Sequence, residues 1–525
     1  MRRYFLSFAF IASLSFLFNP ADAAVQKANE LTFSLKGDIH SADPYGLYEV
    51  ITTGFLYNVY DTLVSRDKDL KIIPCLAESW ISKSPTLMEM KLRQNVKFHE
   101  GEAFTADDVI FSYKRSISEG SDVKAVIASV KDIRKVDDFT VEVETHSSNP
   151  TLLAELYGLM IMSKSWCEKH DATKVAQLTK NEKGYADLHA NGTGPFKLEK
   201  REPEIQTILL RNHNWWGKFE GNIERAIFKP IANDATRIAG LVTGELDLIA
   251  PVPLQDKTRV EAVPSLEIIT KPSLTTIYMV LNVGVNELPS SGIKGKNPLQ
   301  DIRVREAIYR AIDIEAIQKK IMQGTSKPTA LMIGPGIHGY DADLDKRLPY
   351  DPELSKKLLA EAGYSEGFKM AFDTSNDRYI KDEAIAQALA AMLRKVGITL
   401  TLNSTTKSKY FAKVLGGDTE SYLMGWMPGT YDALDPYSNL CETKGKYNIG
   451  KYSNPKLDEM IQKAQVELDD TKRQEYVREI LQIQQKDMAQ IPLHQESLVW
   501  GKRKNVNVVQ RADDYLCMLH LFSKN

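Results

Sequence analysis

Four cysteines and nine histidines are the residues of this chain best suited to redox, metal or nucleophilic chemistry. The cysteines, Cys75, Cys167, Cys441 and Cys517, stand far apart and form no CxxC pair. In an oxidising compartment they permit one or two disulfides with three possible full pairings, and buried free thiols are the alternative. No cysteine or histidine has the spacing of zinc ligands, so we expect no metal site.

The motifs that carry catalytic or phosphate-binding chemistry are missing from the sequence. It holds no GxSxG, no HExxH, no P-loop and no GxGxxG that opens a helix. Residues 192–195, GTGP, lack the lysine and the following serine or threonine of a phosphate loop, and we interpret them as a tight turn. We therefore expect no enzyme and no cofactor.

Length, composition and charge describe a globular protein of several domains. The chain has 525 residues, of which 43% are hydrophobic and 26% charged. One hydrophobic core does not usually support so long a chain, so we expect two or three domains. Because 67 Lys and Arg balance 69 Asp and Glu, the charge gives no support to nucleic acid or an acidic membrane as a partner.

The N-terminus has the pattern of a secretory signal peptide, residues 1–23. Arginines at positions 2 and 3 precede residues 4–18, which carry no charge, and the small residues Ala21 and Ala23 suit cleavage after Ala23. A transmembrane anchor is the alternative, but fifteen residues make only ~22 Å of helix against a hydrocarbon core of ~30 Å. The first cysteine is Cys75, so no lipid anchor is expected and the mature chain should be soluble.

Hydrophobic periodicity predicts a mixed α/β chain. Alternating apolar residues predict strands at 88–92, 139–143 and 398–402. Helical spacing, with capping or breaking residues at the ends, predicts several helices. These are a helix after Thr105 with Asp108 in a capping box, one after Asp301, one between Asp351 and Gly363, one over 385–396 that ends at Gly397, and one after Asn454.

Short motifs then occur in a characteristic order. They are LAESW at 76–80, FHEGEAFTADDVIFS at 98–112, TGPF at 193–196, NWWG at 214–217, GELD at 244–247, VREAIYRAID at 304–313, GW at 425–426, YSNP at 452–455 and IPL at 491–493. In this series the chain resembles the periplasmic dipeptide/oligopeptide-binding proteins, the extracellular solute-binding proteins of ABC importers, over essentially its whole mature length.

The resemblance implies an α/β fold of two lobes joined by a two-strand hinge, with an extra domain on the first lobe. Lobe I would comprise 24–54, 186–271 and 492–525, the extra domain 55–185 and lobe II 272–491. The hinge strands would be 273–283 and 491–500.

The resemblance also implies a role. A monomeric receptor of the periplasm would close its two lobes on a short peptide or a similar solute and deliver it to an inner-membrane ABC permease. The family fold also serves other cargo, so haem, a nickel complex, an opine or an oligosaccharide stays open. A secreted hydrolase is a more distant alternative, and so is a chaperone-like binder of unfolded chains.

Charge recognition is where the chain departs from the family it resembles. There, an aspartate three residues after the tryptophan of the GW segment binds the ammonium group of a peptide, and here that position is Gly429. Asp432 and Asp435 are the nearest acids. Either Asp432 takes the role, or the cargo has no ammonium group there; a turn-forming Asp432 is the structural alternative. Arg378, before the helix at 385–396, resembles the arginine that pairs with a carboxylate.

The remaining expected ligand contacts also rest on the resemblance. Trp426 ends an apolar strand and should face the cleft. Tyr48 and Thr53, with the neighbouring Thr52, lie in the first-lobe segment that lines the cleft in relatives. Tyr278 and Asn282 stand on the first hinge strand, where a purely structural role is the alternative.

The signal peptide generates the first test. Edman or mass-spectrometric sequencing of the exported protein should find an N-terminus at Ala24, within a residue or two. A membrane-embedded product that retains Met1 would contradict this prediction.

Overall fold

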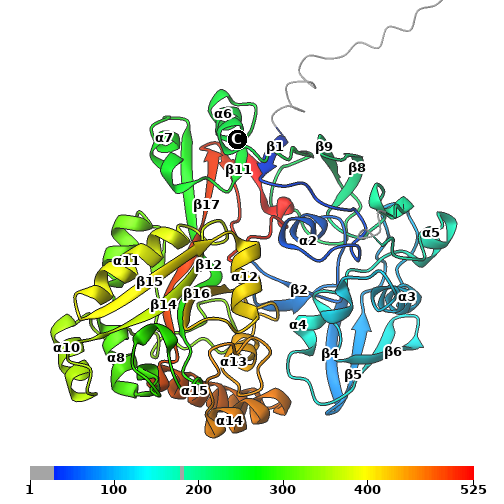
Figure 1. Cartoon of the computed structure of the whole chain (residues 1–525). Helices are drawn as coiled ribbons and strands as arrows, with labels where there is room; N and C mark the ends of the chain where they lie inside the picture. Colours follow the sequence, from blue (N-terminus) through cyan, green and yellow to red (C-terminus); the bar gives the residue numbers. More distant parts are fainter. Residues whose placement is uncertain (1–28, 178–181) are drawn as a thin grey trace, which may run out of the picture.

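The computed structural model describes residues 29–177 and 182–525, and a sheet of eleven strands runs through it (Figure 1). Two long antiparallel strands, β12 (Leu266–Leu281) and β17 (Gln490–Arg503), form its middle. The other strands are β15 (Ile398–Thr405), β14 (Phe368–Ser375) and β16 (Ser421–Trp426) on one side, with β11 (Leu248–Ala250), β1 (Glu30–Leu35), β10 (Arg225–Phe228), β9 (Gln206–Arg211) and β8 (Phe196–Glu202) on the other, and β13 (Lys327–Pro328) beside β17.

The two sides of this sheet build two halves of the molecule, which share only the middle strands. The second half holds β13–β16 and the helices α8 (Ile302–Arg310), α9 (Ile314–Ala316), α10 (Pro352–Glu361), α11 (Asp382–Arg394), α12 (Lys407–Leu415), α13 (Leu434–Leu440), α14 (Pro455–Val466) and α15 (Asp470–Asp487). The first half holds β1, β8–β11, α2 (Val50–Leu56), α6 (Asp234–Thr243), α7 (Lys257–Glu261) and the C-terminal strands β18 (Val506–Asn507) and β19 (Ser523–Lys524).

A separate four-stranded antiparallel sheet extends the first half. Its strands are ordered β4 (Ala77–Ser84), β5 (Leu87–Leu92), β7 (Thr140–Thr145) and β6 (Val130–Asp137), and α3 (Ala106–Ser116), α4 (Leu152–Leu156) and α5 (Lys164–Lys169) lie with it (Figure 1). The hairpin of β2 (Val64–Arg66) and β3 (Ile72–Pro74) precedes it. One continuous cluster of buried side chains joins this sheet to β1, so both pack around a shared core.

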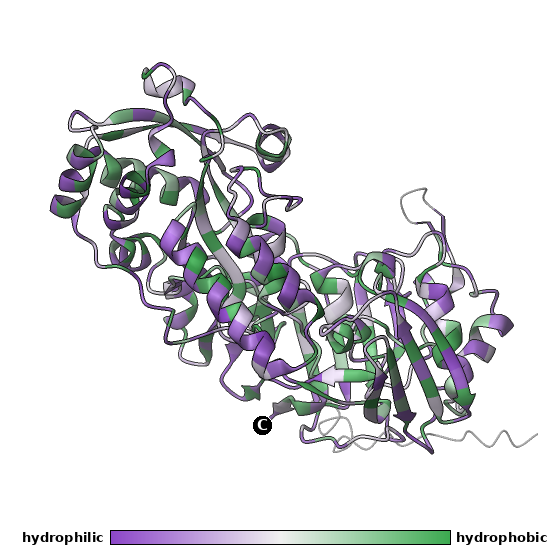
Figure 2. Ribbon diagram, turned by 90° about the horizontal axis from the view of Figure 1, so that it is seen from below, coloured by the Kyte–Doolittle hydropathy of each residue, from purple (hydrophilic) through white to green (hydrophobic). Residues whose placement is uncertain are grey.

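The hydrophobic periodicity of the helices matches the faces that they bury in the core. Figure 2 shows hydrophobic and hydrophilic residues alternating along the helices, as expected when one face is buried and the other solvated. Two further clusters of buried side chains fill the second half, one around α8 and α11 and one around α13–α15. The first of these also takes in α6, so the core continues across β12 and β17 into the first half.

The strands and helices predicted from local patterns are confirmed. The alternating segments become β5, β7 and β15, and the expected mixed α/β class is correct. The Asp301 carboxylate accepts a hydrogen bond from the backbone of Arg303 at 2.9 Å, and the Asp351 carboxylate accepts one from Leu354 at 2.8 Å. These caps satisfy amide groups that the first helical turn leaves without partners.

Other predicted helix ends also depend on contacts between residues close together in the sequence. The Asp108 side chain accepts from the backbone of Thr105 at 2.9 Å, which completes the capping box of α3. Asn454 caps α14. Gly363 and Gly397 follow α10 and α11 with φ of 87° and 95°, a backbone region that side chains disfavour.

The four cysteines are free and buried, so the free-thiol alternative holds and no disulfide forms among them. Burial raises the pKa of the Cys167 and Cys517 thiols to about 12. At neutral pH they are therefore protonated and weakly nucleophilic.

Two predictions concern the organisation of the chain. The signal peptide, residues 1–23, lies outside the described residues. The lobe and extra-domain boundaries remain predictions. Within residues 29–177 and 182–525, no helix has the length and apolarity needed to cross a membrane.

Candidate functional site

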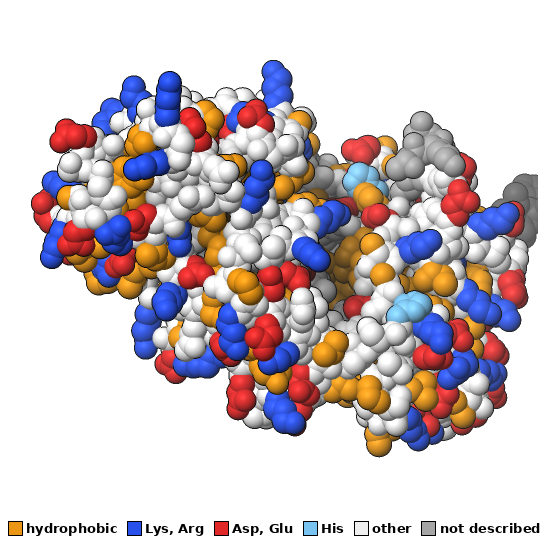
Figure 3. Space-filling view, turned by 60° about the horizontal axis from the view of Figure 1, so that its bottom comes forward, with side chains coloured by type: hydrophobic (Ala, Val, Ile, Leu, Met, Phe, Trp, Pro, Cys, Tyr) orange, Lys and Arg blue, Asp and Glu red, His pale blue; other side chains and the backbone are white. Residues whose placement is uncertain are grey.

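A cavity of about 460 Å³ lies where the two halves meet at the middle strands. Its walls come from both halves and its floor from β12 and β17. Lining residues include Val50 and Asp514 of the first half, Arg378 and Met427 of the second, and Ser273 and Glu496 on the strands. We call it the first chamber. The space-filling view shows the surface hollowed between the two halves (Figure 3).

A second cavity, of about 520 Å³, lies between the β2–β3 hairpin and the second half. Its lining includes Arg66, Leu70 and Thr151 from the first half and His338, Tyr431 and Asp432 from the second. We call it the second chamber. Tyr431 links the two chambers, because its hydroxyl donates a 3.0 Å hydrogen bond to Asp513, which lines the first chamber.

The loop after β16 is organised by Asp435. Its carboxylate accepts from the indole nitrogen of Trp426 at 2.9 Å and from the backbone of Gly429 and Thr430 at 2.7 and 3.2 Å. A Cβ at Gly429 would lie 3.6 Å from this carboxylate. Asp435 therefore puts an acid beside the position where the resemblance expects an aspartate. Burial raises its pKa, although these three donors oppose the shift.

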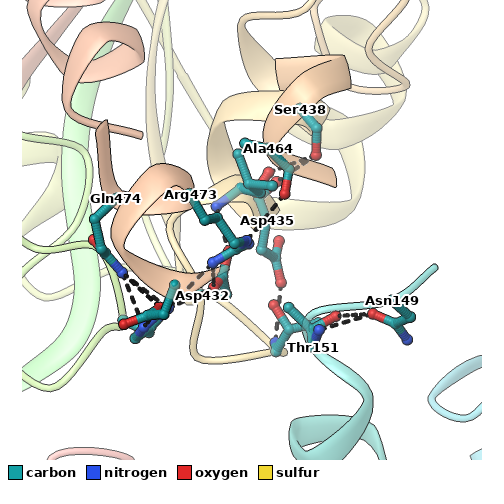
Figure 4. Close-up of polar contacts among 12 residues, drawn as sticks. Asn149, Thr151, Asp432, Asp435, Ser438, Ala464, Arg473 and Gln474 are labelled. Atoms are coloured by element: carbon teal, nitrogen blue, oxygen red, sulfur yellow. Dashed lines mark hydrogen bonds and ion pairs between the residues drawn. The ribbon is translucent and has the colours of Figure 1, made fainter. Parts of the chain in front are cut away.

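Asp432, the acid predicted to replace Gly429, already has a cationic partner. Its two oxygens accept from Arg473 at 2.8 Å each, and one lies 3.1 Å from His338 Nδ1 (Figure 4). Burial opposes ionisation, but the bonds from His338 and Arg473 lower the pKa of Asp432 to about 2. The carboxylate is thus ionised and neutralised within the second half, so the geometry does not favour it as the ammonium partner.

Arg378 is placed as an anion partner should be. It is exposed, it lines the first chamber, and no carboxylate of the described residues forms an ion pair with it. Nearby, Glu496 accepts a hydrogen bond from the backbone of Ile380 at 2.8 Å, and burial raises its pKa. The guanidinium can therefore meet a solute carboxylate without first breaking an internal pair.

The other predicted contacts lie around the chambers and not in their walls. Trp426 is half-buried against Tyr447, with ring centroids 5.2 Å apart, and its neighbour Met427 lines the first chamber. Tyr48 is half-buried and packs on the core of the first half. Thr53 is buried within α2.

Tyr278 and Asn282 lie inside the second half. Tyr278 is fully buried and its hydroxyl has no hydrogen-bond partner. The Asn282 amide donates to the carbonyl of Thr419 at 2.9 Å. These placements favour the structural alternative for both residues, while the ligand roles of the predicted residues remain predictions.

The C-terminal segment contributes site residues that sequence reasoning missed. Asp513 and Asp514 both line the first chamber. Asp514 accepts a 3.1 Å hydrogen bond from the Trp500 indole, and burial, reinforced by the charge of Asp513, raises its pKa to about 7. The only sequence signal was two adjacent acids two residues after Arg511.

Two halves that share a pair of strands and enclose a cavity have the architecture of a protein that binds a small solute. Within the described ranges, no group of three or more His, Cys, Asp or Glu side chains could hold a metal ion. The sequence model of the bacterial extracellular solute-binding proteins, family 5 (middle), matches residues 71–448. The chain belongs to this family: it is a solute-binding protein of an ABC transporter and not an enzyme.

Relatives named for different cargo are similar to this chain in sequence. The chain is 27% identical to heme-binding protein A of Haemophilus influenzae over 79% of its own length and 78% of the relative. It is 25% identical to the glutathione-binding protein GsiB of Salmonella paratyphi A over 96% of both chains. It is 26% identical to the dipeptide-binding protein of Escherichia coli over 90% of its length and 89% of the relative.

Solved structures confirm the predicted two-lobe fold class. HbpA2 from Haemophilus parasuis matches 95% of this chain and 100% of its own with a TM-score of 0.81 at 23% identity. The murein tripeptide binding protein MppA, in an unliganded open form, matches 94% of this chain and 97% of its own with a TM-score of 0.78 at 19% identity.

The Asp432–Arg473 pair predicts a large stability effect. Asp432→Asn leaves the Arg473 guanidinium buried without a counter-ion, so the free energy of unfolding should fall by about 3–5 kcal/mol. Urea denaturation measures this change. Asp470→Asn, which alters an exposed partner of His338, is the control and should change stability by less than about 1 kcal/mol. A fully stable Asp432→Asn variant would show that the pair does not hold the loop.

Asp514 predicts a pH dependence. Its folded pKa of about 7 lies above the ordinary 3.8, so the folded state binds the proton more tightly than the unfolded state. Its contribution to stability is complete below pH 4 and is lost as the pH rises through 7. Asp514→Asn should therefore gain about 1–4 kcal/mol over the wild type between pH 4 and pH 8. Urea titrations across this range, with Asp418→Asn at an exposed site as control, would refute the prediction if both curves stayed parallel to the wild type.

Proposed function

We propose that this protein captures a peptide or peptide-like solute in the first chamber and delivers it to the permease of an ABC importer. The observation that carries the proposal is the composition of the chamber wall, which takes side chains from both halves and from the two strands that join them. A solute that fills this space contacts both halves at once.

Such contacts supply the free energy for closure. A solute bound between the halves interacts more strongly with the closed arrangement than with the open one, so it shifts the population toward the closed form. The halves share only β12 and β17 as continuous strands, so changes in the dihedral angles of a few residues there can move one half relative to the other. The permease would then recognise the closed form.

Two charged side chains suggest which solute would suit this site: one lies in the wall of the first chamber, and the other, Asp435, follows β16 outside the lining of either chamber. Arg378 is available for a carboxylate, and Asp435, beside Gly429, is the better candidate for an ammonium group because Asp432 is paired with Arg473. A short peptide with free termini carries both charges. Trp426, held by Asp435, would supply an apolar surface next to them.

Other cargo fits the same transport role. Relatives at 25–27% identity are named for haem, glutathione and dipeptides, and fold does not decide among them. A nickel complex, an opine or an oligosaccharide remains an alternative. The unpaired Arg378 favours a cargo with a carboxylate, which the peptide, glutathione and haem all carry.

The location and partners follow from the same role. We place the mature protein in the periplasm after cleavage of residues 1–23, without a lipid anchor, as a monomer whose partners are the solute and the permease. The near-balance of charge supports no nucleic acid partner.

Closure provides the test of this proposal. Native mass spectrometry of protein purified from its own host without denaturation should reveal a retained solute. Adding that solute to stripped protein should raise Tm, because it binds only the folded state, and reduce the radius of gyration in solution scattering.

Single substitutions test which side chains bind the solute. Arg378→Gln and Asp435→Asn should each weaken affinity by about 30-fold or more if the solute bears both charges, since losing a desolvated partner costs ~2–5 kcal/mol. Asp458→Asn, on α14 and outside the lining of both chambers, is the control and should bind normally. Tight binding with an unchanged scattering profile would refute closure.

A further inference from the structure

Arg66 differs from every other buried arginine of the described residues. Six arginines are buried, and five of them form an ion pair with an aspartate. These five pairs are Arg115–Asp43, Arg201–Asp38, Arg237–Asp234, Arg473–Asp432 and Arg511–Asp513. Arg66 is only 5% exposed, yet no carboxylate in the described ranges forms an ion pair with it.

The polar partners of Arg66 are few. One terminal nitrogen donates to the carbonyl of Leu70 at 2.6 Å, and Nε is buried without any hydrogen-bond partner. The guanidinium lies 4.1 Å from the ring centre of Tyr431 and 5.4 Å from that of Tyr157. These rings stabilise a cation by their faces, but they do not neutralise its charge.

The acids that line the second chamber with Arg66 have other partners: Asp69 pairs with Lys68, Asp470 with His338 and Asp432 with Arg473. Asp513 bonds to Arg511, and Arg511 in turn donates to the backbone carbonyl of Arg66 at 3.3 Å. Asp513 therefore forms its ion pair with Arg511, and Arg511 reaches only the backbone of Arg66. Within the second chamber Asp432 is neutralised by Arg473, so it does not serve Arg66 either.

Arg66 also faces open space. It lines the second chamber and a smaller cavity of about 260 Å³ next to it, which Tyr57, Trp215 and Trp216 also line. A buried cation is costly unless it is paired, and this one borders the space in which a partner would fit. We propose that Arg66 binds an oxyanion group, a carboxylate or a phosphate, on the transported solute. This inference rests on the proposed function and extends the solute from the first chamber into the second.

The position of Tyr431 connects such an anion to closure. Arg66 ends β2 in the first half, whereas Tyr431 belongs to the loop after β16 in the second half and stacks on the guanidinium. Tyr431 has a φ of 58°, which costs energy for a side chain of this size. An anion on Arg66 would lie beside this loop and would contact both halves.

The stability of the unliganded protein provides the first test. Arg66→Met removes an unpaired buried charge and keeps most of the volume, so the variant should melt at the wild-type temperature or above it. Arg473→Met is the contrast, because it leaves Asp432 buried without a counter-ion and should lower Tm. If Arg66→Met lowered Tm as much as Arg473→Met does, Arg66 would be a structural residue and the proposal would fail.

Anion binding provides the second test. Succinate and inorganic phosphate are titrated separately against the full chain at constant ionic strength, with succinamide as the neutral analogue of succinate, and Tm is followed. At least one anion should raise Tm in the wild type, Arg66→Met should lose that shift, and Arg66→Lys should keep part of it because it keeps the charge but not the fork. Lys68→Gln, which removes an exposed cation from the same hairpin, should respond like the wild type.

The outcomes separate the possibilities. A response to succinate alone identifies a carboxylate, and a response to phosphate alone identifies a phosphate group. An equal shift in wild type and Arg66→Met, or no shift with either anion, overturns the proposal. Neither result touches the closure experiment, which uses the retained solute; conversely, a failure of closure would leave an Arg66-dependent anion shift intact.

Discussion

The pairing of β12 with β17 is the interaction on which the rest of the structure depends. Their register runs from Leu266 opposite Arg503 to Val280 opposite Gln490, and it shifts between Pro272 and Thr276. Three residues of β12 there face one residue of β17, Glu496. A bulge of this kind bends the strands and redirects side chains. Ser273 and Glu496 consequently reach the floor of the first chamber, and the two halves diverge from it.

Buried ion pairs organise the walls around that floor. Asp432 with Arg473 holds the loop that follows β16. Arg511, paired with Asp513 two residues further on, donates to the Arg66 carbonyl and the Tyr157 hydroxyl and so joins the C-terminal segment to the first half. The hydroxyl of Tyr431 joins the two arrangements. Because each pair neutralises its own charge, these acids are not free to bind a solute. Among the described arginines that line the two chambers, Arg378 in the first and Arg66 in the second form no ion pair.

Local signals explain why most elements could be predicted. The capping box at Thr105 and the Asp301 and Asp351 caps join residues two or three positions apart. Both partners of each hydrogen bond therefore lie in the same short segment of the sequence. The family motifs likewise predicted the class of protein correctly. Arg378 could be predicted as a candidate because its position before α11 is a local feature.

The sequence by itself determined the secondary structure, the two-lobe class and the transport role, since periodicity, caps and ordered motifs are properties of short segments. Tertiary structure alone decided which charges are free. Asp432 looked available in the sequence, but Arg473 lies 41 residues away and neutralises it. Asp435 and Arg66 became candidates only in the folded chain. Folding places Asp435 beside Gly429 and leaves Arg66 without an acidic partner among the described residues. Whether a charge can bind a solute depends on every group within a few ångströms, and distance along the chain does not report that.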